Sequence, residues 1–175
     1  MSADVSIESK SVKIAVLTVS DTRTPETDTS GDILGERIST AGHIVAARQI
    51  VVDDVNLLQE AIRNWLNDEE IDVIITTGGT GLTGRDVTPS AVRPLLDKVI
   101  DGFSVVFHMI SFQSIGLSTI QSRAFAGLSN GKIIFCLPGS NGAVKDGWDK
   151  IIVHQLNQNY RPCNLIELMP RFQEV

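Results

Sequence analysis

Short apolar runs alternate with segments of helical periodicity along the chain. Four runs rich in β-branched residues, Lys13–Val19, His43–Val52, Asp72–Thr76 and Lys132–Leu137, are typical of buried strands. A polar segment with turn residues follows each run, and helical patterns lie between the runs. Strands that alternate with helices predict a single three-layer α/β domain, in which helices flank a mostly parallel central sheet.

Helix signals fill the intervals between these runs. Ser30 is a candidate N-cap, and Gly42 stands where a C′ glycine would end that helix. Asp53 or Asp54 is the candidate N-cap of the next helix. The apolar positions of these two helices and of a last one recur at helical spacing: Ile33, Leu34, Ile38, Leu58, Ile62, Trp65, Leu66, Trp148, Ile151, Ile152 and Leu156.

The segment after the third run carries two prolines. Thr88 and Pro89 are typical of a cap and a first helical residue. Pro94 would cost about 3 kcal/mol inside a helix, so we expect one turn and then a break or kink there. The segments Phe103–Ile115 and Thr119–Ala126 are predicted to be helical.

The length of 175 residues fits one domain. We expect a flexible N-terminal tail over residues 1–12, an α/β domain over 13–160, and a C-terminal extension over 161–175 that packs on the domain or on a neighbouring subunit. The apolar runs look too short to cross a membrane, so no membrane partner is expected. The amino end lacks the pattern of a secretory signal or a transit peptide, which predicts the cytoplasm.

Charge and cysteine content argue against a nucleic-acid-binding protein and against a short zinc or redox motif. The formal net charge is −6 and the 15 basic residues are scattered, so nucleic acid is not an expected partner. The two cysteines, Cys136 and Cys163, lie too far apart for a short zinc or redox motif. A small anion can still bind locally, because backbone amides act at short range whatever the net charge.

The stretch TTGGTGLTGRDVTP, from Thr76 to Pro89, is the main candidate for binding chemistry. Its glycines let backbone amides approach a phosphate, and its threonines add donors. The stretch lacks the lysine of a Walker A loop and the spacing of a dinucleotide site. The alternative is a tight turn without a ligand, but a turn needs only one or two glycines, and the stretch has four: Gly78, Gly79, Gly81 and Gly84.

Two carboxylates are expected to meet at this loop. Asp53 follows the second apolar run and Asp86 lies within the loop, so both would face the carboxyl edge of a parallel sheet. Carboxylates beside phosphates predict Mg²⁺. The alternative is that Asp53 only caps a helix and Asp86 only shapes a turn. Ser122 and Arg123 offer a hydroxyl and a guanidinium to an anion, although a solvated arginine is the commoner case.

These motifs, in this order, resemble the MoaB/MogA family. The resemblance rests on TVSD at Thr18–Asp21, DTSG at Asp28–Gly31, TTGGTG with RDVTP, SRAFAG at Ser122–Gly127, and LPGS at Leu137–Ser140. It implies a molybdopterin-binding α/β fold and homo-oligomers built on trimers, either trimer or hexamer. It also implies molybdopterin as substrate, Mg-ATP as co-substrate, and other molybdenum cofactor biosynthesis proteins as partners.

The resemblance also implies roles for individual residues. By motif position, catalysis and metal binding fall on Asp53 and Asp86; phosphate or nucleotide binding on Thr77, Gly78, Gly79, Thr80, Gly81, Asp28, Ser30 and Gly31; pterin binding on Ser122, Arg123, Pro138, Gly139 and Ser140. The chain keeps both aspartates, which favours activity. The hypothesis is therefore a molybdopterin adenylyltransferase. The alternatives are a molybdopterin carrier without catalysis and a scaffold with a vestigial pocket.

Overall fold

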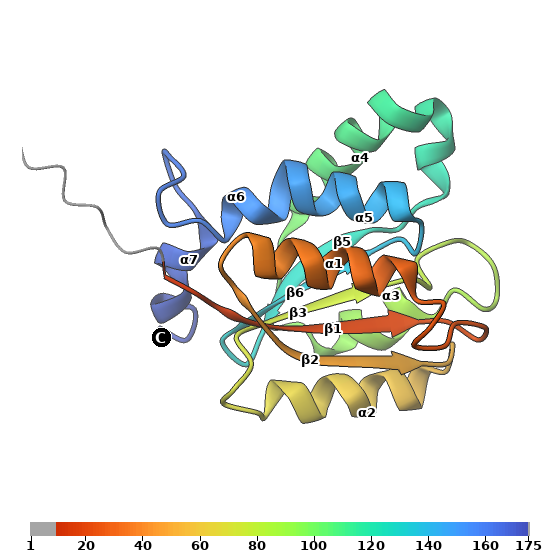
Figure 1. The fold of residues 1–175 in the computed structure, drawn as a ribbon, viewed down its shortest axis with the longest axis horizontal. Coiled ribbons are helices and arrows are strands. Elements are labelled where there is room, and N and C mark those ends of the chain that lie inside the picture. Colours follow the sequence, from red (N-terminus) through yellow and green to blue (C-terminus); the bar gives the residue numbers. More distant parts are fainter. Residues whose placement is uncertain (1–9, 175) are drawn as a thin grey trace, which may run out of the picture.

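A six-stranded sheet forms the centre of the fold in the computed structural model, which describes residues 10–174 (Figure 1). The strands are β1 (Lys13–Val19), β2 (Ile44–Val51), β3 (Val73–Thr77), β4 (Lys98–Val99), β5 (Phe125–Ser129) and β6 (Lys132–Leu137). Their order is β2-β1-β3-β6-β5-β4. The first four strands in this order are mutually parallel, and β5 is antiparallel to both neighbours. The predicted mostly parallel sheet is confirmed.

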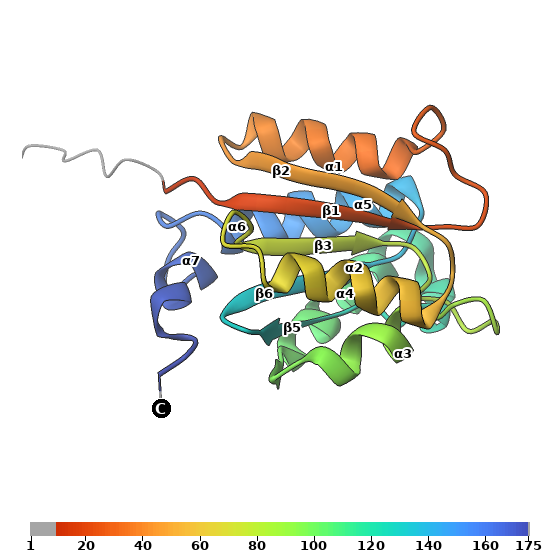
Figure 2. The ribbon, with the colours of Figure 1, turned by 90° about the horizontal axis from the view of Figure 1, so that it is seen from below.

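Helices cover both faces of the sheet, as Figures 1 and 2 show. One face packs against α1 (Thr29–Thr40), α4 (Asp101–Ile115) and α5 (Asn141–Gly147). The other face packs against α2 (Val55–Leu66) and α3 (Thr88–Val92). The remaining elements are short: η1 (Arg93–Leu95), η2 (Gly116–Gln121), η3 (Trp148–Ile152), α6 (Val153–Gln155), α7 (Leu165–Leu168) and η4 (Met169–Arg171).

Strand β1 explains why the sheet has two cores. Successive side chains of a strand point to opposite faces. Ile14 and Val16 therefore join the core beneath α1, α4 and α5, whereas Ala15 and Leu17 join the core beneath α2 and α3. All four are buried, which is why the run reads as continuously apolar rather than alternating. The predicted three-layer α/β domain is confirmed.

The carboxyl ends of the four parallel strands lie at one edge of the sheet. In the strand register Val19 pairs with Val51, Thr18 with Thr77, and Thr77 with Leu137. The loops that follow these strands therefore open on the same side, as predicted. The C-terminal α7 lies at the opposite end of the sheet in both views (Figures 1 and 2).

The prediction of a helix over Thr119–Ala126 is wrong. The 3₁₀ turn η2 ends at Gln121, and β5 begins at Phe125. Asn130 and Gly131 have φ angles of 48° and 74°, which turn β5 back into the antiparallel β6. An Asn-Gly pair with positive φ is typical of a two-residue hairpin. Pairing with β6 therefore overrides the helical periodicity of the segment.

The helix α1 is capped by Asp28 and not by Ser30. The Asp28 carboxylate accepts a hydrogen bond from the Gly31 amide at 3.0 Å, whereas Ser30 lies inside the helix and donates to Asp28. Both residues are candidate caps by type, and only one can precede the first helical turn. Gly42 follows the helix with a φ of 82°, as predicted for a C′ glycine.

Pro94 breaks the helix that begins at Thr88, as predicted. The helix α3 ends at Val92, and Pro94 lies in the 3₁₀ turn η1. Thr88 is not the cap, because it lies within the helix and its hydroxyl donates to the carbonyl of Gly78 at 2.7 Å. The last predicted helix runs from α5 to α6 through the π-helical turn η3.

The chain ends differ in what the structure describes. The flexible tail was predicted over residues 1–12. Residues 1–9 lie outside the described residues, so the tail stays a prediction there. Val12, the last residue of the predicted tail, is buried. Near the other end Ile166 is buried, and Leu165, Met169 and Phe172 pack against the core beneath α1, α4 and α5. The domain boundaries stay a prediction.

By length and composition, the helical stretch over residues 101–121 is apolar enough to cross a membrane. This differs from the sequence prediction, because polar residues divide the stretch into runs that look short one by one. A single helix of this kind is weak evidence for a membrane span, since a core helix passes the same test. Only 22% of it is buried, however, so much of its apolar surface is open.

Candidate functional site

A cavity of about 480 Å³ lies at the carboxyl edge of the parallel strands. Five segments contribute to it: the end of β1, the end of β2, the glycine loop after β3, the turn after β6, and the stretch from α4 to Ser122. Ten residues predicted for the site line it: Asp53, Gly78, Gly79, Thr80, Gly81, Asp86, Ser122, Pro138, Gly139 and Ser140. The structure thus brings both aspartates and most of the glycine loop to one cavity.

The glycine loop passes so close to β1 that side chains are excluded. Gly78 has a φ of 107°, and a Cβ there would lie 2.2 Å from the carbonyl oxygen of Val19. Gly79 also has positive φ. Within residues 10–174 the amides of Gly79 and Thr80 donate no hydrogen bond, so two N–H groups at the cavity are available to an anion.

Replacing Gly78 with alanine is expected to destabilise the fold. The positive φ alone costs about 1–3 kcal/mol for a residue with a Cβ, and the contact with Val19 adds to it. Urea denaturation followed by circular dichroism would measure the loss. Gly84→Ala is the matched control, because a Cβ at Gly84 meets nothing within 4 Å. Equal stability of the two variants would contradict the close approach.

Asp86 is held inside its loop by hydrogen bonds. Its carboxylate accepts from the Thr83 amide at 2.9 Å and from the Thr83 hydroxyl at 2.6 Å. Burial alone would raise the pKa of Asp86, but these bonds, a backbone hydrogen bond from Gly81 and the charge of Arg123 hold that pKa below its ordinary value. Asp86 is therefore a fixed anion at neutral pH.

Asp53 has the opposite electrostatics. The helix α2 is capped by Asp54, whose carboxylate accepts from the amides of Asn56 and Leu57, so Asp53 is free to face the cavity. Within the described range the only hydrogen bond to its carboxylate comes from the backbone of Asp21, and no side chain donates to it. Burial, then the charge of Asp21, raise the pKa of Asp53, and Asp86 adds to the increase.

Asp21 and Arg85 form an ion pair beside Asp53. Arg85 Nε donates to the Asp21 carboxylate at 2.9 Å, and the Asp53 amide donates to the same carboxylate at 3.1 Å. The hydrogen bond from Arg85 is the main cause that lowers the pKa of Asp21. This pair joins the loop after β1 to the glycine loop. Both residues lie within sequence motifs, and neither was predicted to have a role.

The Arg123 side chain holds the glycine loop in place by hydrogen bonds. Its guanidinium donates to the carbonyl of Gly81 from Nε and to the carbonyl of Asp86 from Nη2, both at 2.7 Å, and its amide donates to Thr80. Arg123 therefore fixes both ends of the segment that carries Asp86. It does not line the cavity, and the predicted contact with a pterin stays a prediction.

Four more predicted residues lie outside the cavity. Asp28 and Ser30 are buried, and Asp28 accepts from Thr18, from Gly31 and from Arg48, so it stabilises the start of α1. Thr77 is buried, and its hydroxyl donates to the carbonyl of Pro138. The binding roles predicted for Asp28, Ser30, Gly31 and Thr77 stay predictions.

Sequence reasoning missed one wall of the cavity. This wall comes from α4 and η2, which contribute Ser111, Ile115, Ser118 and Gln121. None of these residues was predicted for the site, and their position depends on how α4 packs on the sheet. Ser20 was missed as well, although it directly follows β1 and lies within a quoted motif.

The cavity suits a divalent cation held together with phosphate. Among residues 10–174 no group of three or more His, Cys, Asp or Glu side chains could hold a metal alone. Mg²⁺ uses one or two carboxylates and completes its shell with waters and phosphate oxygens. The carboxylate of Asp53, which receives no side-chain hydrogen bond within the described residues and has a raised pKa, would gain most from a cation nearby.

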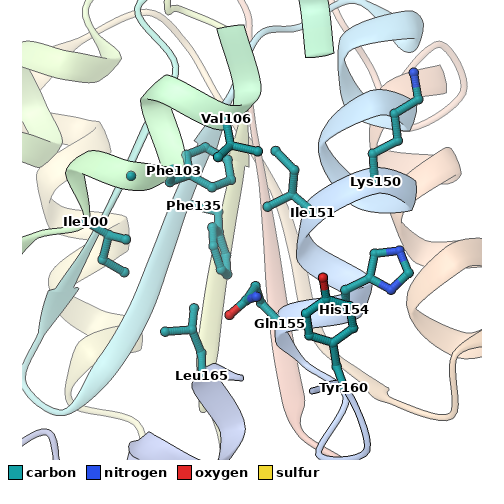
Figure 3. Close-up of a pocket in the computed structure, with 11 residues that line it drawn as sticks. Ile100, Phe103, Val106, Phe135, Lys150, Ile151, His154, Gln155, Tyr160 and Leu165 are labelled. Carbon is teal, nitrogen blue, oxygen red and sulfur yellow. The ribbon is translucent and has the colours of Figure 1, made fainter. Parts of the chain in front are cut away.

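A second cavity, of about 380 Å³, has different chemistry (Figure 3). Apolar side chains such as Phe103, Phe135 and Leu165 line one side of it, and His154, Gln155 and Tyr160 lie on the other. It lies between α4 and α6, and none of the candidate site residues lines it. It is not where the predicted phosphate chemistry would occur.

Comparisons with known proteins show which proteins the chain resembles. A family model described as "Probable molybdopterin binding domain" matches residues 15–158. Molybdenum cofactor biosynthesis protein B of Escherichia coli strain K12 is 43% identical over 162 residues, which are 93% of this chain and 95% of that protein. The protein of the same name from Bacillus cereus is 47% identical over 148 residues, covering 84% of this chain and 88% of that one. A crystal structure of Molybdenum cofactor biosynthesis protein B superposes with a TM-score of 0.82 at 47% identity, covering 84% of this chain and 92% of that chain.

Proposed function

From the premise that the chain belongs to the MoaB/MogA family, we propose that it is a molybdopterin adenylyltransferase that uses Mg-ATP. The protein takes part in molybdenum cofactor biosynthesis and carries a molybdopterin-binding domain. The observation that supports catalysis is the pair Asp53 and Asp86, which line the same cavity as the open amides of the glycine loop. A carrier needs the amides and not the carboxylates.

The proposed reaction is a nucleotidyl transfer. A terminal phosphate oxygen of molybdopterin attacks the α-phosphorus of ATP and forms a new P–O bond. The bond from the α-phosphorus to the oxygen that bridges to the β-phosphorus breaks, and pyrophosphate leaves. Mg²⁺ held by Asp53 and Asp86 would supply charge neutralisation of the phosphates.

The residues of this chain act by positioning. The amides of Gly79 and Thr80 can donate to phosphate oxygens, and they need not move because Gly78 is packed against β1. Arg123 fixes the segment that carries Asp86. Ser122, Pro138, Gly139 and Ser140 line the same cavity and are proposed to contact the pterin. We expect the reaction to occur in the cytoplasm.

An assay of pyrophosphate release tests the proposal. Purified protein is incubated with molybdopterin, ATP and magnesium, and pyrophosphate is followed with a coupled phosphatase. Release that requires both substrates supports the adenylyltransferase. Binding of molybdopterin without release would instead indicate a carrier, and binding of neither ligand would indicate a scaffold.

Arg123→Lys is expected to lower kcat by about 10- to 100-fold with little change in the KM for molybdopterin. A lysine ammonium cannot reproduce the fork that holds the carbonyls of Gly81 and Asp86, so Asp86 would lose its position. Steady-state kinetics separates the two parameters. A rise in KM with unchanged kcat would show that Arg123 binds the pterin phosphate instead.

We also expect a homo-oligomer, trimer or hexamer. The helix α4 buries Phe103 and Phe107 but leaves Val105, Met109 and Phe112 from 52% to 64% exposed. A helix that is apolar all round is typical of one buried on every side. Light scattering would establish the number of subunits.

A further inference from the structure

A groove of about 560 Å³ lies behind the glycine loop, between α3 with η1 on one side and α4 on the other. Its polar lining residues are Ser90, Arg93, Ser104, His108, Ser122 and Arg123. Two prolines and an alanine complete it, and no acidic side chain lines it. The site described above does not use this groove, although Ser122 lines both hollows.

The groove contains two arginines whose positive charges are not paired with an acidic side chain of the described residues. Neither Arg93 nor Arg123 forms an ion pair with any residue in the range 10–174. By contrast, five other arginines of that range do so: Arg37, Arg48, Arg85, Arg161 and Arg171. In a chain with a net charge of −6, two arginines without an ion pair on one groove make it locally positive.

Arg93 is held with its donors free. Its guanidinium lies over the ring of Phe125, 4.5 Å from the ring centroid, so the planar group is oriented before any ligand arrives. It donates no hydrogen bond to a described residue. Guanidinium groups of this kind bind phosphate oxygens in pairs.

The floor of the groove is rigid. Ser122 accepts a hydrogen bond from the Ala124 amide at its hydroxyl oxygen, which leaves its O–H free to donate. His108 Nε2 lies 3.0 Å from the carbonyl oxygen of Ser122, and Arg123 is fixed by the carbonyls of the glycine loop. Ser90 makes no side-chain hydrogen bond within the described part of the chain.

We propose that this groove binds an oxyanion of the phosphate class, inorganic phosphate or pyrophosphate, through Arg93, Ser90 and Ser122, with Arg123 adding charge. The ligand class follows from these residues alone. That pyrophosphate reaches the groove as a product of the adjoining cavity rests on the proposed function. The same chemistry fits the terminal phosphates of bound ATP.

Isothermal titration of sodium pyrophosphate into the full chain, without magnesium or molybdopterin, tests the groove. Arg93→Gln is expected to weaken binding by at least about tenfold, because a charged hydrogen-bond donor is lost. Arg63→Gln, which makes the same change of charge on an exposed arginine of α2, is expected to bind as the wild type does. Equal affinity of Arg93→Gln and Arg63→Gln would overturn the proposal.

A second variant covers the case that Arg93→Gln fails to fold, because Arg93 also packs on Phe125. Ser90→Asp places a carboxylate in the groove from an exposed position, and it is expected to abolish pyrophosphate binding. Unchanged binding there would also overturn the proposal. Circular dichroism confirms the fold of each variant.

A parallel titration with ATP distinguishes the two sources of the anion. If the groove variants weaken both ligands, the terminal phosphates of ATP occupy the groove; if they weaken pyrophosphate alone, the free anion does. Neither titration requires turnover. An inactive protein that binds pyrophosphate would therefore refute the proposed function and leave the groove intact.

Discussion

Replacing Asp53 with asparagine is expected to reduce AMP transfer by about 100-fold or more and, at the same time, to raise the melting temperature of the free protein at pH 7. The loss follows from removing one of two carboxylates that would hold Mg²⁺ at the cavity. The gain follows from the raised pKa of Asp53, which arises from burial and from the charges of Asp21 and Asp86. Ionising this group costs the folded protein stability.

The direction of the change in melting temperature depends on pH. A carboxyl whose pKa is raised above 3.8 on folding binds its proton more tightly in the native state. Its ionisation therefore removes stability as pH rises from about 3.8 through the native pKa, and the full cost is present above that pKa. The variant should exceed the wild type in melting temperature at pH 7 and match it below pH 3.8, as measured by thermal scans across this range.

Asp54→Asn is the matched control for Asp53. Asp54 caps α2 through the amides of Asn56 and Leu57, and asparagine is an equally good cap, so stability and transfer should both be retained. Loss of transfer in Asp54→Asn with full activity in Asp53→Asn would reverse the assignment of the two neighbours.

The strands around the cavity could be predicted because strands that are buried on both faces have continuously apolar sequences. The runs that form β1, β3 and β6 are apolar at almost every position, since helices cover both faces of the sheet. Parallel pairing then places their carboxyl ends together. Gly78 could be predicted for a similar reason, because no other residue fits its φ and its distance from β1.

The strands β4 and β5 were not predicted, although the sequence carries a local signal for β5. The pair Asn130 and Gly131 indicates a hairpin, and it would have placed β5 before β6 instead of extending a helix through Phe125. The strand β4 has only two residues and pairs only with β5, so no periodicity marks it.

Interactions between distant side chains could not be predicted at all. Arg85 and Asp21 are 64 residues apart, and Arg123 reaches Gly81 across 42 residues. Residue type suggested that Arg123 would bind an anion, whereas its guanidinium donates hydrogen bonds to the carbonyl oxygens of Gly81 and Asp86. Which acceptor an arginine meets depends on tertiary packing, and neither spacing nor composition records it.

Asp86→Asn is expected to abolish AMP transfer, with a loss of at least about 100-fold, while the fold and molybdopterin binding are retained. Its effect on stability should be opposite to that of Asp53→Asn. The pKa of Asp86 is held below 3.8, mainly by the bonds from Thr83 against the cost of burial. The ionised group therefore stabilises the native state above pH 3.8, and this contribution is lost as pH falls through the native pKa.

Thermal scans of Asp86→Asn should accordingly show a lower melting temperature than the wild type at pH 7, with the difference closing towards low pH. Thr83→Ala separates charge from loop shape, because it removes the 2.6 Å hydroxyl bond and keeps the carboxylate. If Asp86 acts by holding a metal ion with its charge, Thr83→Ala retains most of the transfer activity. If both variants lose activity equally, Asp86 acts only by shaping the loop, and the role of a second metal-holding carboxylate falls to another residue.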